Sequence, residues 1–74
     1  MITTTQDLVA EALFVSDLQP SETPTPQAIQ RAISHMIQRY GADGCAACVA
    51  TEFGDHPDTA VRRMGWVRQI LSTV

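Results

Sequence analysis

The chain has 74 residues, of which 45% are hydrophobic and 18% are charged, and its formal net charge is −3. This composition excludes an intrinsically disordered chain, and the length excludes two separate hydrophobic cores, so we expect one folded domain over residues 1–74. The negative balance disfavours nonspecific binding to polyanions, because such binding depends on Lys and Arg side chains that neutralise phosphates.

The first predicted helix covers about residues 6–17. Thr4 and Asp7 have the spacing of a capping box, in which side chains bond the unpaired amides of the first helical turn. The apolar residues of this segment cover more than one face, and they are Leu8, Val9, Ala12, Leu13, Phe14 and Val15. A face this wide is typical of a central core helix, and it also suits a partner-binding or dimer surface.

A proline-rich linker follows at residues 18–26 and separates two helices rather than two domains. Thr25 and Pro26 predict the N-cap and the first residue of a second helix, since a first-turn residue needs no amide hydrogen. Apolar residues then recur every three or four positions, at Ile29, Ile33, Met36, Ile37 and Tyr40. Gly41 is expected to end this helix in the left-handed conformation.

Two more helices are predicted in the rest of the chain. Asp43 is a candidate N-cap for a third helix over about residues 44–53, which Gly54 would end. A fourth helix begins near Pro57, and its apolar stripe consists of Ala60, Met64, Val67, Leu71 and Val74. Gly65 lies on the opposite side, where it either permits the close approach of another backbone or is simply tolerated.

These segments predict an all-α domain built as a small four-helix bundle. Its expected core residues are Leu8, Leu13, Ile29, Ile33, Ile37, Val49, Phe53, Met64, Val67 and Leu71. No apolar run reaches the roughly 20 residues of a membrane-spanning helix, and the N-terminal sequence MITTTQD lacks the basic and apolar regions of a signal peptide. We therefore expect a cytoplasmic protein without a membrane partner.

The segment CVATEFGDHPDTAVRRM, residues 48–64, resembles the two-helix core of helix-turn-helix DNA-binding domains. In that motif a small residue lets the helices approach, and a Gly four positions later takes the left-handed turn; Ala50 and Gly54 match these positions. Phe53 and Val61 would fill the core between the two helices. The resemblance therefore implies a helix-turn-helix-like C-terminal half.

The same resemblance implies that the last helix is a recognition helix whose first exposed residues face the DNA major groove. The candidate DNA-binding residues are His56, Thr59, Arg62 and Arg63. Asp55 and Asp58 depart from the usual pattern, because their carboxylates would repel phosphates, and they serve instead as N-terminal caps. The alternative is a structural corner that contacts no nucleic acid.

A second resemblance extends over more of the chain. Residues 11–19 and 44–66 are similar to segments of short proteins from high-GC Gram-positive bacteria. This similarity implies a bacterial helical protein of the cytosol, and it assigns no role to any residue.

Cys45 and Cys48 form a Cys-x-x-Cys pair. A redox pair would need the strand-turn-helix setting of thioredoxin-like proteins, which the sequence lacks, and a zinc site would need two more ligands. His35 and His56 do not have the short spacing that zinc fingers use. The sequence favours two small buried residues on a closely packed helix, without a metal.

The sequence predicts a small regulatory binding module that is not an enzyme and has no catalytic residue, metal or cofactor. One hypothesis is DNA binding through the helix-turn-helix-like corner. The alternative is a protein-interaction adaptor or a small homodimer, motivated by the broad apolar surface of the first helix and by the acidic balance. Whether the partner is DNA or a protein stays open at this point.

Overall fold

The computed structural model describes residues 5–73, within which every regular element is a helix. Helix α1 spans Thr5–Val15, a short 3-10 turn η1 spans Pro20–Glu22, α2 spans Pro26–Asp55 and α3 spans Pro57–Thr73. The all-α prediction is confirmed. Two predicted features, the capping residue Thr4 and the stripe residue Val74, lie outside the described residues.

Helix α2 bends sharply at Gly41, which has φ 71° and ψ 175°. This conformation favours glycine, because a side chain there would clash with the backbone. The bend divides α2 into a first arm, residues 26–40, and a second arm, residues 42–55. The positive φ of Gly41 was expected, but the predicted second and third helices form one bent element, so the expectation of four separate helices is not confirmed.

The two arms of α2 approach each other closely at the bend. A Cβ atom on Gly44 would lie only 2.9 Å from the Cβ of Tyr40, so this position has no room for a side chain. The thiol of Cys45 donates a hydrogen bond of 3.7 Å to the carbonyl of Met36, which joins the second arm to the first. The bend is therefore supported by local packing as well as by Gly41.

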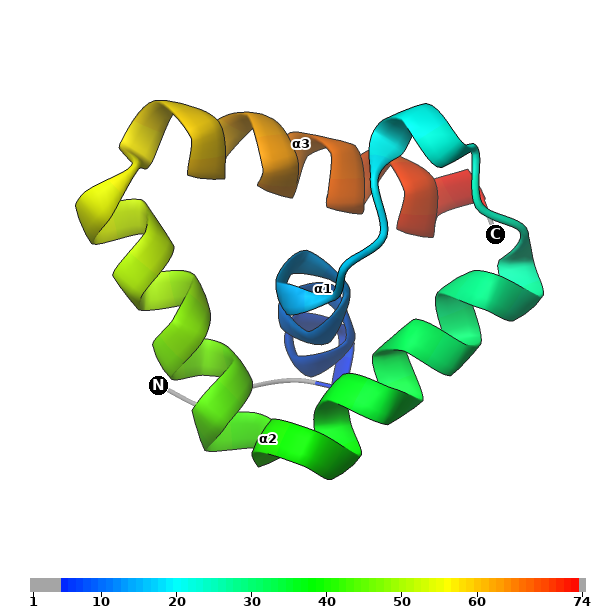
Figure 1. The fold of residues 1–74 in the computed structure, drawn as a ribbon, viewed down its shortest axis with the longest axis horizontal. Helices are drawn as coiled ribbons and strands as arrows, with labels where there is room; N and C mark the ends of the chain where they lie inside the picture. The colour runs from blue at the N-terminus through cyan, green and yellow to red at the C-terminus, as the bar shows by residue number, and fades with distance from the viewer. Residues whose placement is uncertain (1–4, 74) are drawn as a thin grey trace.

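Helix α1 is the central helix of the fold. Figure 1 shows it almost end-on, with the two arms of α2 and helix α3 arranged around it as the sides of a triangle. Its middle turns are buried on several sides, at Ala10, Ala12, Leu13 and Phe14. The central-helix interpretation of its wide apolar surface is confirmed, because the other helices cover most of that surface.

Of the ten predicted core residues, all except Leu8 and Ile37 lie inside the core cluster or pack against it. Four of them are buried: Leu13, Ile29, Val49 and Val67. The other six are half-buried: Leu8, Ile33, Ile37, Phe53, Met64 and Leu71. Every member of the predicted core is at least partly shielded from solvent, because each apolar stripe faces α1 or is packed beside it.

The linker between α1 and α2 ends as the sequence predicted. The hydroxyl of Thr25 accepts a hydrogen bond of 3.1 Å from the amide of Ala28, and Pro26 occupies the first helical position. This N-cap replaces one of the missing backbone partners of the first turn. The predicted start of the helix at Pro26 is confirmed.

The corner between α2 and α3 differs from the predicted one. Only His56 separates the two helices, with φ −138° and ψ 65°, and its amide donates to the carbonyl of Glu52 at 2.7 Å. Pro57 disfavours helical geometry at the residue before it, which places the break at His56. Gly54 lies inside α2 without a positive φ, so the predicted left-handed turn at Gly54 is wrong.

The packing at this corner also differs from the helix-turn-helix resemblance. Ala50, expected to let the helices approach, is exposed, and Val61, expected in the core, is 61% exposed. Phe53 stacks instead on Phe14 of α1, with ring centroids 6.0 Å apart. The corner packs against α1 rather than closing on itself, and a helix-turn-helix half is not confirmed.

Candidate binding groove

Arg63 on α3 ties the end of α1 to the rest of the fold. Its Nε–H donates to the carbonyl of Phe14 at 2.6 Å, and its Nη2–H donates to the carbonyl of Ser16 at 2.8 Å. The last carbonyls of a helix have no partner within the helix, and a cation there also interacts favourably with the helix dipole. Arg63 therefore serves as a C-terminal cap supplied by a different helix.

The guanidinium of Arg63 also lies between two aromatic rings. Its carbon is 5.7 Å from the ring centre of Phe14 and 5.3 Å from that of Trp66. Burial lowers the pKa of Arg63 below that of a free arginine side chain. Arg63 is half-buried and bound to backbone, so the expectation that it is an exposed residue of α3 is wrong.

The other three candidate DNA-binding residues remain on the surface. His56, Thr59 and Arg62 are all exposed around the first turns of α3, as the resemblance implied. Asp55 and Asp58 are exposed on the same part of the chain. The structure thus leaves one projecting arginine and two carboxylates at the surface that was expected to meet phosphates.

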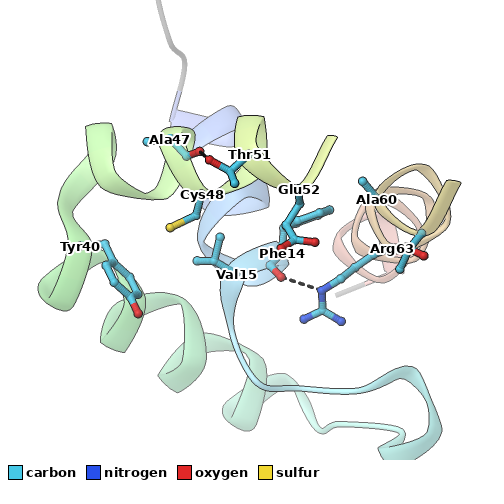
Figure 2. Close-up of a pocket in the computed structure, with 10 residues that line it drawn as sticks. Phe14, Val15, Tyr40, Ala47, Cys48, Thr51, Glu52, Ala60 and Arg63 are labelled. Atoms are coloured by element: carbon cyan, nitrogen blue, oxygen red, sulfur yellow. Dashed lines mark hydrogen bonds between the residues drawn. The ribbon is translucent and has the colours of Figure 1, made fainter. Parts of the chain in front are cut away.

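A groove of about 450 Å³ opens beside the end of α1. Its lining comes from α1, from both arms of α2 and from the start of α3, and consists of Phe14, Val15, Tyr40, Ala47, Cys48, Thr51, Glu52, Thr59, Ala60 and Arg63. In Figure 2, Tyr40 lies across this space from Val15 and Cys48. The groove has an apolar floor and a rim that carries hydroxyl groups and one carboxylate.

The bend at Gly41 creates this groove, because it turns the first arm of α2 to face the second. Tyr40 ends the first arm and remains 43% exposed, with the guanidinium of Arg39 5.5 Å from its ring centre. Small residues on the second arm and on α3, Ala47 and Ala60, leave room opposite Tyr40. The sequence predicted Tyr40 as a member of an apolar stripe and gave no sign of the groove.

The cysteines lie on the second arm of α2. Cys45 is buried, and burial raises the pKa of its thiol, with further contributions from nearby Cys48 and Glu11. This shift is opposite to the lowered pKa of a reactive redox cysteine. Cys48 is half-buried and lines the groove.

Among residues 5–73, no three side chains of His, Cys, Asp or Glu lie close enough together to hold a metal ion. Within the same range, no helix combines the length and the apolar character needed to cross a membrane.

Comparison of the chain with protein-family models, with curated proteins and with solved structures found no match. Both resemblances given above therefore stay predictions.

Proposed function

We propose that this protein is a small regulatory binding module, not an enzyme, that holds an amphipathic helix of a partner protein in the groove beside α1. The observation that carries the proposal is the groove itself, an open hollow of about 450 Å³ between three helices. Amphipathic helices bind other proteins by laying an apolar face into grooves of this kind. The floor formed by Phe14, Val15 and Ala60 offers the apolar contact that such a face needs.

The shape of the groove favours a helix over a flat protein surface. The aromatic ring of Tyr40 stands at one end, and the wall opposite it carries small side chains, Ala47 and Thr51 among them. A partner residue that projects into this space would replace water against Val15 and Cys48. Burial of such anchor residues contributes most of the affinity of typical protein interfaces.

The test is a selection from a displayed library of amphipathic helical peptides, with this protein as bait. We expect enriched peptides that lose binding to the variant Ala47→Trp, which fills the groove, and that still bind Ser34→Trp, an equally bulky change at an exposed position of the first arm. A bound peptide should also slow alkylation of the groove thiol of Cys48. If no peptide is enriched, or if both Trp variants bind equally, the proposed function is wrong.

DNA binding is the second candidate function, and the exposure of His56, Thr59 and Arg62 on α3 favours it. The loss of Arg63 to the α1 cap and the carboxylates of Asp55 and Asp58 weigh against it. Fluorescence anisotropy with duplex DNA at two salt concentrations distinguishes the two functions. Salt-sensitive binding at micromolar protein that Arg62→Gln abolishes would favour DNA over a protein partner.

A further inference from the structure

The charged residues of α2 are divided between its arms. The first arm carries Arg31 and Arg39 and no carboxylate, whereas residues 41–61 carry four carboxylates and neither Lys nor Arg. The groove lies along the acidic second arm, which supplies Ala47, Cys48 and Thr51 to its wall. The charges of this wall therefore restrict which partner can enter.

The carboxylates nearest the groove stand at one end of it. Glu52 lines the groove, and Asp55 is exposed one helical turn beyond Thr51, on the same side of the arm. Both lie in the last turn of α2, where the unpaired carbonyls of a helix carry partial negative charge. The two side chains and the helix end thus place negative charge at the same end.

Arg63 also lines the groove and keeps its positive charge, but it forms no ion pair with Glu52 or Asp55. Its Nε–H and Nη2–H donate instead to the carbonyls of Phe14 and Ser16. At the opposite end of the groove, the guanidinium of Arg39 stacks over Tyr40. The groove therefore has an acidic end at Glu52 and Asp55 and an aromatic end at Tyr40.

We infer that the partner helix is basic on one side: it places an apolar anchor between Tyr40 and Cys48 and a Lys or Arg against Glu52 and Asp55. Cys48 and Asp55 are seven positions apart on one helical arm, which corresponds to about 10 Å. A partner helix aligned with the arm spans this distance in about two turns. The inference rests on the proposed function, since it specifies the partner of the same groove.

The peptide selection tests this inference when the polar positions of the library are each Lys, Gln or Glu. We expect the enriched peptides to carry Lys about two turns from their anchor, on one side of it. Enriched peptides with Gln or Glu at that position would overturn the inference and leave the proposed function standing. A selection that enriches no groove-dependent peptide would overturn the proposed function itself.

Variants of the protein give a second readout. Glu52→Gln and Asp55→Asn should each weaken a selected Lys peptide about two- to fivefold at low salt, and less at high salt, as is usual for exposed ion pairs. Glu22→Gln is the matched control, because Glu22 lies on η1 away from the groove and Gln can still accept the amide of Gln19. It should leave the affinity unchanged.

Reversing the charge at the acidic end of the groove gives a third test of the inference. In the double variant Glu52→Lys and Asp55→Lys, selection from the same library should enrich Glu at the position where the parent protein enriches Lys. Both residues are exposed, so the reversal removes no buried contact of the fold. An unchanged preference for Lys in the double variant would show that these carboxylates do not face the partner.

Discussion

Replacing Arg63 with Met should destabilise this protein more than any other single change of a charged residue on α3. Met keeps much of the length and apolar contact of the arginine side chain but donates no hydrogen bond. The change leaves the carbonyls of Phe14 and Ser16 without the donors that they have at 2.6 and 2.8 Å. It also removes the cation from between the rings of Phe14 and Trp66.

The size of the effect follows from these contacts. A hydrogen bond to a charged group contributes about 1.5–3 kcal/mol, and values near the lower end apply to Arg63 because its side chain is only half-buried. Two such bonds give a loss of about 3–4 kcal/mol. A domain of this length has a total stability of about 4–11 kcal/mol. At about 4–8 °C per kcal/mol, we expect the melting temperature to fall by about 12 to 32 °C.

Thermal and urea unfolding, followed by circular dichroism, measure this loss. Arg62→Met is the matched control, since Arg62 is the exposed neighbour, and it should change stability by less than about 0.5 kcal/mol. Arg63→Lys should recover less than half of the loss, because an ammonium group cannot reproduce the two-pronged geometry of a guanidinium. Equal stability of Arg63→Met and Arg62→Met would refute the cap assigned to Arg63.

Three further predictions concern the backbone, the pH dependence and the thiols. Gly41→Ala should destabilise the fold by about 1–3 kcal/mol, because Gly41 has a φ of 71°. Gly65→Ala should stabilise the fold by up to about 1 kcal/mol, because its new Cβ would meet nothing within 4 Å. Chemical unfolding of both variants checks that the two changes in stability have opposite signs. Burial, and secondarily the neighbouring Asp7, raise the pKa of Glu11 above its ordinary value of 4.5, so protonation of Glu11 favours the folded state. This stabilisation is fully present below pH 4.5 and is lost as the pH rises through the raised pKa of the folded state. Glu11→Gln should therefore gain stability relative to the parent mainly at neutral pH, and a difference that does not change between pH 4 and 7 would contradict this. Cys48 should react with iodoacetamide before the buried Cys45, whose pKa is raised, and mass spectrometry of partly alkylated protein would reveal the reverse order.

The sequence predicted those parts of the fold that depend on local chemistry. The N-cap at Thr25 and the positive φ of Gly41 both follow from the preferences of single residues, and both are present. The helical stripes also identified most of the buried and half-buried positions, because periodic apolar residues usually face some other element, although the stripe residue Tyr40 is exposed. These signals did not specify which element each stripe would face.

The errors arose where the outcome depends on packing between distant segments. Gly54 was predicted to take a left-handed turn because of its place in a motif, but Pro57 fixes the break at His56 and leaves Gly54 helical. Arg63 was predicted to project because it stands near the start of an exposed helix. Its hydrogen-bond partners are the carbonyls of Ser16 and Phe14, which lie 47 and 49 positions earlier in the chain. No local sequence pattern indicates a contact between residues so far apart.

The groove illustrates the same limit and also shows how fold and binding depend on each other. Gly41 turns the arm that ends at Tyr40 toward the arm that carries Cys48, and Arg63 holds the end of α1, with Val15, at the floor between them. A change that straightens α2 or frees the end of α1 would therefore alter the groove as well as the stability. Substitutions confined to the exposed wall of the groove, such as Ala47→Trp, separate the effect on binding from the effect on stability. They fill the groove and leave the bend at Gly41 and the cap formed by Arg63 in place.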